Sequence, residues 1–255
     1  MRFELLDHGY LSLVDSWGSD EAIICAARMS TAKGFLGWGP KDEGPCEVCG
    51  NFSHNCAACG YTGRKIVPGD EKLLRYLWEH DHWTPFEMAG LTVEVKAPIM
   101  TFREWHRHRV PFGYNEMSAR YVPLPDENYS PTVERIVQGS RKTANRQAAS
   151  VAGEIAPIDA EAWLDELAKA YEHAERVYRL GLSLGVPKEL ARLPVPVGRY
   201  SRMRATGNLR GWLGFLRLRH APQAQHEIRV YAEAIAGIIA EKFPRTHALY
   251  AEGRA

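Results

Sequence analysis

The chain has 255 residues, of which 45% are hydrophobic and 25% charged, and its formal net charge is +1. That length allows one large domain with a buried core, and the near-neutral charge excludes the global basic field of many nucleic-acid-binding proteins. The lack of a long uninterrupted apolar run argues against a membrane span, and the acids near the start argue against a signal peptide. We therefore expect a cytoplasmic protein with neither a membrane nor a nucleic acid as partner.

The first thirty residues predict two short strands followed by a helix. The strands cover residues 3–7 and 10–15, on either side of a His-Gly turn. Small and apolar residues at helical spacing then predict a helix over residues 20–30, which Ser19 or Asp20 can cap.

Residues 33–68 are glycine-rich and weakly periodic, and we interpret them as an insert in a single domain over residues 1–255. The insert carries two C-x-x-C pairs, formed by Cys46, Cys49, Cys56 and Cys59. In a reducing compartment this spacing predicts a structural zinc ion rather than disulfides, with a metal-free loop as the alternative. Four thiolate ligands would leave no open position for a catalytic metal.

The middle of the chain predicts two helices around a half-buried strand. The first helix covers residues 71–82, the strand covers residues 91–97, and Pro98 begins a helix over residues 99–109. Residues 124–160 give only weak signals of secondary structure.

The C-terminal third is predominantly helical. Helices are predicted over residues 160–185, 209–220 and 224–243, with an extended segment over residues 199–207 and Asn208 as a candidate cap. Helices and strands mix without regular βαβ alternation, which predicts an α+β fold.

The stretch RHRVPFGYNEMSARY, which begins at Arg107, gathers cationic, acidic and hydroxyl side chains within fifteen residues. On the predicted helix before it, Arg103 and Arg107 are four residues apart and should share a face. Beyond the turn VPFGY, strand alternation predicts that Glu116, Ser118 and Arg120 point the same way. The planar fork of arginine suits phosphate, so the stretch indicates an anion-binding site.

Further arginines recur nearer the C-terminus, at Arg202, Arg204, Arg210, Arg217 and Arg219. Arg210 stands at a predicted helix start, where free backbone N–H groups also favour phosphate. These arginines indicate a site for a nucleotide or another polyphosphate, and a solvated charged helix face is the alternative.

His82 and Glu87 flank the segment TPFE after a predicted helix. Their spacing is compatible with a metal pair, an acid–base pair or a helix terminus, and the pattern leaves all three open.

RHRVPFGYNEMSARY resembles the signature of the flavin-dependent thymidylate synthases, R-H-R-x-x-S-x-N-E-x-S-x-R-Y, and HDHWTPFE, VKAPI, GVPKELAR and LRLR agree in order. The resemblance covers residues 3–32, 70–122 and 165–250. It implies the α+β fold of thymidylate synthase complementing proteins, with a mixed sheet, a layer of long helices, and a homotetramer with shared active sites. It also implies an FAD enzyme that converts dUMP to dTMP, with methylenetetrahydrofolate as carbon donor and NADPH as reductant.

The resemblance implies residue roles as well. Arg219 and His82 match catalytic positions, and Arg219 matches the arginine that activates the pyrimidine. The positions that match FAD-binding residues are His82, Thr84, Arg107, His108, Arg109, Val110, Asn208, Arg210 and Leu218. The positions that match nucleotide-binding residues are Glu104, Arg107, Glu116, Met117, Ser118, Ala119, Arg120, Arg192 and Arg219.

Three departures from the family pattern concern the nucleotide. The serine between RHR and NE is absent, and VPFGY is one residue longer than the usual turn. Glu104 stands where family members often have a glutamine, so its carboxylate would need Arg103, His108 or another cation as partner beside a phosphate.

These departures leave open UMP as the substrate instead of dUMP, as in similar enzymes of nucleoside-antibiotic pathways. An alternative of another class is a zinc-knuckle protein that binds nucleic acid. The neutral charge and the lack of interleaved basic and aromatic residues near the cysteines argue against it.

Overall fold

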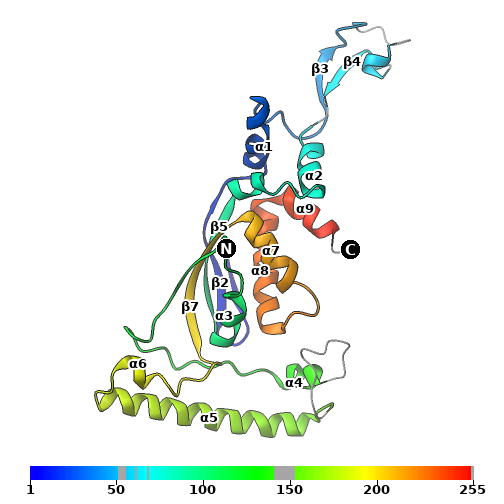
Figure 1. Ribbon diagram of the computed structural model, residues 1–255. Helices are drawn as coiled ribbons and strands as arrows, with labels where there is room; N and C mark the ends of the chain where they lie inside the picture. The colour runs from blue at the N-terminus through cyan, green and yellow to red at the C-terminus, as the bar shows by residue number, and fades with distance from the viewer. Residues whose placement is uncertain (51–55, 61, 68, 141–152, 254–255) are drawn as a thin grey trace. The chain divides into compact units, whose positions relative to one another are not determined.

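The computed structural model describes residues 1–50, 56–60, 62–67, 69–140 and 153–253 (Figure 1). The chain divides into two compact units. The first unit comprises Met1–Asp15, Leu91–Gly207 and Gly211–Ile238, and the second comprises Ser16–Gly90, Asn208–Arg210 and Ile239–Ala255. This division does not test the expectation of a single domain, which stays a prediction.

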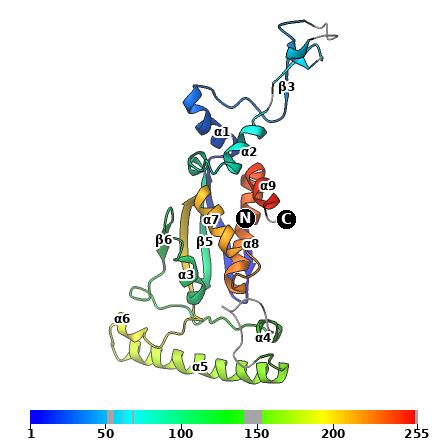
Figure 2. The ribbon, with the colours of Figure 1, turned by 45° about the vertical axis from the view of Figure 1, so that its right-hand side comes forward.

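A five-stranded sheet forms the centre of the first unit, with strand order β1-β2-β5-β7-β6 (Figures 1 and 2). The strands are β1 (Arg2–Leu5), β2 (Gly9–Trp17), β5 (Gly90–Pro98), β6 (Gly113–Glu116) and β7 (Tyr200–Asn208). The three predicted strands 3–7, 10–15 and 91–97 are present, and the extended segment 199–207 is β7. β6 begins earlier than the extended segment predicted from Glu116, because Gly113 and Tyr114 of the predicted turn already belong to this strand. The α+β class is confirmed.

The two faces of this sheet differ in polarity, as strand alternation requires. On β5, Leu91, Val93 and Val95 are fully buried on one face. On the other face the hydroxyls of Thr92 and Thr206 lie 2.9 Å apart. The apolar face must therefore be covered by helices, while polar pairs stabilise the opposite face.

Three helices supply the apolar cover: α3 (Ile99–Trp105), α7 (Leu209–Arg219) and α8 (His226–Lys242). Their contacts centre on Trp105, which is fully buried. Its ring centroid lies 4.9 Å from that of Phe215 and 6.1 Å from that of Tyr231. Truncation of a buried aromatic side chain of this size to alanine typically costs about 3–5 kcal/mol, so this cluster contributes strongly to the stability of the unit.

The long helix α5 (Pro157–Ser183) crosses the end of the sheet, accompanied by α4 (Val133–Ser140) and α6 (Lys188–Ala191) (Figures 1 and 2). It corresponds to the helix predicted over residues 160–185, and it begins earlier because a proline is favoured in the first turn. Only Ala160, Glu175 and Tyr178 of this helix are buried. The weak local signals did not predict α4 and α6.

The second unit combines α1 (Asp20–Arg28), α2 (Glu71–Glu79) and α9 (Pro244–Glu252) with a hairpin of β3 (Lys41–Pro45) and β4 (Arg64–Val67). Short 3-10 helices cover Met29–Thr31, Ala57–Cys59 and Thr84–Met88. None of the helices within the described residues is long and apolar enough to cross a membrane.

Carboxylates and hydroxyls fix the ends of the helices in this unit. Ser19 caps α1 as predicted, since its hydroxyl accepts a hydrogen bond from the N–H of Ala22 at 3.2 Å. Asp20 instead caps α9, accepting from the N–H groups of Arg245 at 2.8 Å and Thr246 at 3.2 Å. The single helix predicted over residues 224–243 is correct for α8, but α9 follows it directly and was not predicted.

The helix predicted over residues 71–82 ends earlier than expected, at Glu79. Asp81 has a positive φ of 55°, which no α-helix permits. His82 therefore belongs to the segment after α2 and not to the helix.

Glu175 and Arg199 form a deeply buried ion pair in the first unit. The carboxylate accepts from Nη2 of Arg199 at 2.6 Å and from Nε of Arg179 at 2.6 Å. Although desolvation opposes ionisation, these hydrogen bonds hold the pKa of Glu175 below its ordinary value. The Arg199 side chain is fully buried and also donates to the Pro125 carbonyl at 2.8 Å.

Glu175→Ala should lower the free energy of unfolding by about 3 kcal/mol, because Arg199 would remain buried without its main counter-charge. Urea unfolding followed by circular dichroism measures this loss. Glu172→Ala is the matched control, since Glu172 lies exposed on the same helix, and its change should stay within about 0.5 kcal/mol. Equal effects of the two substitutions would contradict the assigned role of the buried pair.

Candidate active site

The sequence pattern predicted that the RHR segment continues the preceding helix. The structure differs, because α3 ends at Trp105. The phenolic hydroxyl of Tyr114 donates to the carbonyls of Trp105 at 3.3 Å and His108 at 2.5 Å. Tyr114 thus satisfies carbonyls at the end of the helix. Arg107 lies beyond this end, and the prediction that Arg103 and Arg107 share a helical face is wrong.

The VPFGY turn is held against β7 by its two aromatic residues. Gly207 leaves room for the Phe112 ring, because a Cβ atom on Gly207 would lie 2.7 Å from it. Phe112 also packs edge-on against Trp212, with ring centroids 4.7 Å apart, and stacks on Tyr114 at 5.8 Å. Neither aromatic residue was predicted to shape the site, although their spacing around a glycine was a usable signal.

The segment after the turn pairs with β7 only as far as Glu116, which lies opposite Met203. After the backbone N–H of Met117 donates to Arg202, the chain turns, and the Ser118 carbonyl accepts from Tyr121 at 3.0 Å. The predicted extended alternation of Glu116, Ser118 and Arg120 is therefore wrong beyond Glu116. The residues from Glu116 to Arg120 therefore form a compact loop, in which Ala119 is buried.

Arg219, at the end of α7, makes the most specific polar contacts among the candidate residues. Its Nε donates to Nε2 of His108 at 2.9 Å, and its Nη2 donates to the Glu104 carbonyl at 3.1 Å. Its Nη1 contacts the Glu104 carboxylate in an ion pair. The cation that balances Glu104 is thus Arg219, and neither Arg103 nor His108 fills that role.

His108 is a neutral acceptor in this arrangement. Desolvation lowers its pKa, and the positive charge of Arg219 lowers it further, to about 4. The histidine ring also packs on Phe215, with centroids 4.9 Å apart. The lone pair of Nε2 and the Glu104 side chain together hold the guanidinium at one orientation, while two of its five N–H donors remain for a ligand.

Arg107 and Arg109 flank this cluster and are exposed. Neither side chain has a polar partner among the residues that the structure describes, and Val110 beside them is 90% exposed. Free guanidinium groups next to an exposed apolar side chain suit the phosphates and the ring of a flavin nucleotide.

Arg120 and Arg192 belong to neighbouring segments. Arg120 lies 3.8 Å from Glu189 of α6, and Lys188 donates to the Tyr121 carbonyl at 2.9 Å. Arg192 follows α6 directly and is exposed. The structure thus brings the loop at Ser118 next to the helix that precedes Arg192.

The second unit holds His82, Thr84, Asn208 and Arg210. His82 and Thr84 are exposed, and His82 packs edge-on against Tyr76 at 5.6 Å. Arg210 forms an ion pair with Glu87 at 2.5 Å. The Glu87 carboxylate, which the sequence pattern allowed as a metal ligand, is therefore engaged by an arginine.

Leu218 and Arg217 lie exposed on α7, which is in keeping with the solvated face considered for Arg217. Arg204 of the polar sheet face lies 3.6 Å from Glu94. The predicted cationic stripe is therefore distributed over β7 and α7, and Arg219 alone of its members contacts the RHR segment within the described residues.

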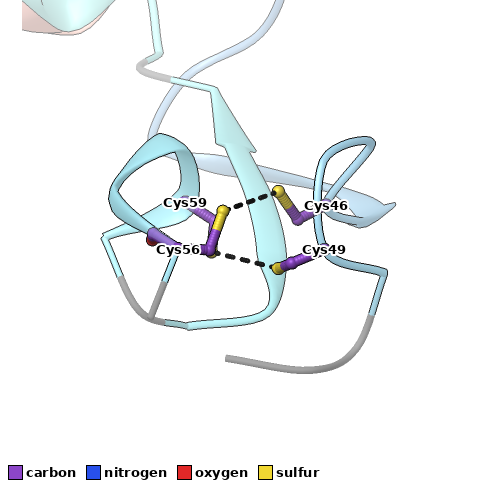
Figure 3. Close-up of side chains that lie close together, drawn as sticks. All are labelled: Cys46, Cys49, Cys56 and Cys59. Carbon is purple, nitrogen blue, oxygen red and sulfur yellow. Dashed lines mark hydrogen bonds between the residues drawn. The ribbon is translucent and has the colours of Figure 1, made fainter. Parts of the chain in front are cut away.

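The four cysteines of the insert converge as predicted, and their Sγ atoms all lie within 4.8 Å of one another (Figure 3). In the described part of the chain they are the one group of three or more potential metal ligands that meet.

Comparison with known proteins gives full-length similarity. The model of the family described as "Thymidylate synthase complementing protein" matches residues 12–245. A flavin-dependent thymidylate synthase of Thermus thermophilus is 37% identical over 252 residues, which cover 99% of this chain and 79% of that protein. One from Thermosipho africanus is 36% identical over 248 residues, covering 96% and 92%.

Two solved structures are similar along nearly their whole length. Both are crystal structures of a UMP/dUMP methylase, PolB, from Streptomyces cacaoi. The structure bound with 5-Br UMP has a TM-score of 0.73 and 31% identity, covering 96% of this chain and 94% of that one. The structure bound with 5-Br dUMP has a TM-score of 0.74 and 32% identity, covering 98% and 97%.

The low pKa of His108 predicts a pH dependence of stability. The unfolded chain takes up a proton on this histidine below about pH 6.5, whereas the folded chain does so only near pH 4. The free energy of unfolding should therefore fall as the pH decreases through this window. Because the ring is partly exposed, we expect a loss of about 1 kcal/mol between pH 7 and pH 5.

His108→Gln should remove this contribution, since its amide oxygen can accept from Arg219 and does not titrate. Urea unfolding of both proteins at pH 7 and pH 5 isolates the difference. Identical pH dependence of the two proteins, or a His108 pKa near 6.5 by NMR, would show that His108 is not held neutral.

Proposed function

Because the chain belongs to the thymidylate synthase complementing protein family, we propose that it is an FAD-dependent enzyme that methylates a uridine monophosphate at C5. The proposed reaction converts dUMP to dTMP, with methylenetetrahydrofolate as carbon donor and NADPH as reductant. The observation that carries this proposal is the oriented Arg219 beside the exposed RHR segment. Reduced FAD, when bound, supplies the hydride of the reductive methylation.

In this proposal Arg219 is catalytic. Its two uncommitted N–H groups donate to a pyrimidine carbonyl. The positive charge of this largely desolvated guanidinium then stabilises the negative charge that develops on the carbonyl as the new carbon–carbon bond forms. Glu104 and His108 act as positioning residues, because they take the other donors and restrict rotation of the side chain. The Glu104 carboxylate is neutralised by Arg219, which removes its repulsion of a nucleotide phosphate.

The remaining roles follow the motif positions. Phosphate and base of the nucleotide bind the loop Glu116, Met117, Ser118, Ala119 and Arg120, together with Arg107 and Arg192. FAD binds the residues that match the family's flavin positions, with His82 also on the flavin side of the reaction: His82, Thr84, Arg107, His108, Arg109, Val110, Asn208, Arg210 and Leu218. Exposed guanidinium groups at Arg107, Arg109 and Arg192, which have no polar partner among the described residues, support these assignments.

UMP is the second candidate substrate. It is favoured by the similarity to a UMP/dUMP methylase whose structures are bound with 5-Br UMP and with 5-Br dUMP. The VPFGY turn lies between the proposed flavin and nucleotide segments, and its anchoring by Phe112 and Tyr114 fixes the backbone there. A zinc-knuckle nucleic-acid-binding protein is not favoured, since the similarity to enzymes extends over 99% of the chain.

A homotetramer with shared active sites completes the proposal. Helix α5 presents a stripe of apolar side chains at helical spacing, with Leu180 54% exposed, and Leu184 directly after it 73% exposed. Leu190 in α6 is 51% exposed, and Leu193, just after α6, is 78% exposed. A long helix that buries so little of its own apolar surface is suited to packing against other copies of the chain.

We further propose one domain over residues 1–255, with the cysteine-rich insert at about 33–68 carrying a zinc ion. β2 and α8 each contribute residues to both compact units, which supports a single domain. A cytoplasmic location suits both a nucleotide substrate and thiolate ligands, which persist in reducing compartments.

The enzymatic proposal predicts a methylated nucleotide as product. Purified, flavin-loaded protein mixed anaerobically with NADPH, methylenetetrahydrofolate and either dUMP or UMP should give dTMP or its ribose counterpart, identified by mass spectrometry. Reduction of the flavin by NADPH, seen as bleaching, without formation of a methylated nucleotide would contradict the proposal. A strong preference for dUMP over UMP would reject the second candidate.

Arg219→Ala should lower kcat by at least about 100-fold while FAD content is largely retained, because the guanidinium stabilises charge in the transition state. Arg217→Ala is the matched control on the same helix, since that side chain is exposed and has no polar partner in the described part of the chain. Its rate should stay near that of the wild type. Loss of FAD from the Arg219 variant would contradict the catalytic role.

Leu184→Glu should shift the assembly toward smaller species, since it places a charge in the proposed interface of α5. Size-exclusion chromatography with light scattering measures the mass, and circular dichroism checks that the chain stays folded. The control Glu172→Lys should keep the wild-type mass. An unchanged mass of the Leu184 variant at equal concentration would place the interface elsewhere.

A further inference from the structure

The Sγ atoms of the cysteine cluster, formed by Cys46, Cys49, Cys56 and Cys59, lie close enough together to share one metal ion. The Sγ atoms of Cys46 and Cys56 lie 3.8 Å apart, and those of Cys49 and Cys59 lie 3.7 Å apart (Figure 3). Disulfide bonding requires about 2.05 Å, so the sulfurs are not bonded to each other. A tetrahedron with Zn–S bonds of about 2.3 Å has edges of about 3.8 Å, which matches both pairs.

A glycine turn after each pair of cysteines shapes this cluster. Each C-x-x-C is followed directly by a glycine with positive φ, 60° at Gly50 and 56° at Gly60. Such a turn favours glycine and folds the two sulfurs of a pair toward one point. The N–H of Gly63 also donates to Sγ of Cys59 at 3.3 Å, a contact that favours a thiolate.

The insert has no apolar core of its own within the described residues. Between residues 41 and 67, the buried hydrophobic side chains described are those of Cys46 and Cys56 alone. Val48 is 75% exposed and Ile66 is 48% exposed. A two-stranded hairpin of this size is marginal in water without a staple, so its fold needs another source of free energy.

We infer that the cysteine cluster binds one Zn²⁺ through four thiolates, and that this ion takes the place of a hydrophobic core in the insert. Four thiolates whose Sγ atoms all lie within 4.8 Å would repel one another. A divalent cation between them attracts all four negative charges and so offsets this repulsion. Four sulfur ligands close the coordination sphere, so the ion is structural. The inference is independent of the enzymatic proposal, because the insert contains none of the proposed flavin or nucleotide residues.

The test is elemental analysis of the full-length protein purified under reducing conditions. We expect about one zinc per chain in the wild type and background zinc in Cys56→Ser. Cys25→Ser is the matched control, since Cys25 lies in α1 outside the cluster, and it should keep its zinc. Zinc retained by the Cys56 variant would overturn the site, and iron in place of zinc would overturn the choice of metal.

Hydrogen exchange tests the structural role. Removal of the metal by a chelator should speed exchange of amides in β3 and β4, while the amides of α7 and α8 around the Trp105 core keep their protection. Unchanged exchange in the hairpin after zinc removal would show that the ion does not fold the insert. Flavin content of the same samples, which should not change, separates this outcome from a failure of the enzymatic proposal.

Discussion

The packing of Trp105 against α7 and α8 is the interaction on which the first unit and its candidate site depend. Trp105, at the end of α3, packs against Phe215 of α7 and Tyr231 of α8. This packing brings the polar residues of α3 and α7 to the same place. Arg219 reaches the Glu104 carboxylate and His108 because these helices meet there. A close-packed aromatic core changes little in shape, so it holds the guanidinium in a fixed orientation before any ligand arrives.

The turn between the RHR segment and the loop at Ser118 has a structural explanation that its length alone does not provide. Phe112 occupies the space above Gly207, and the hydroxyl of Tyr114 donates to the carbonyls where α3 ends. The longer turn is therefore ordered by aromatic packing and by pairing of β6 with β7. Family resemblance locates the proposed flavin and nucleotide segments, and this packing determines the backbone that joins them.

The two parts of the chain obtain their stability from different physical sources. The sheet and its helices bury apolar and aromatic surface, and a buried ion pair at Glu175 and Arg199 ties α5 to the segment that leads into β7. The cysteine-rich hairpin buries almost no apolar side chain in its described residues, and thiolate–metal bonds are the proposed substitute. This difference explains how an insert can interrupt the family fold without drawing on its core.

The order of most helices and strands, the cysteine cluster and the family were predictable from local pattern and from one long motif. Hydrophobic period located α1, α5 and α8, and the C-x-x-C spacing located the cluster, because both signals depend on neighbours in sequence. The early ends of α2 and α3, the pairing of β6 and the extra helix α9 were not predictable. They follow from backbone conformation and from contacts between distant residues, such as Tyr114 with the carbonyls of α3 and Asp20 with the start of α9. The sequence by itself determined which chemistry-bearing residues are present, whereas only tertiary packing decided that Arg219, and not a neighbour on α3, balances Glu104.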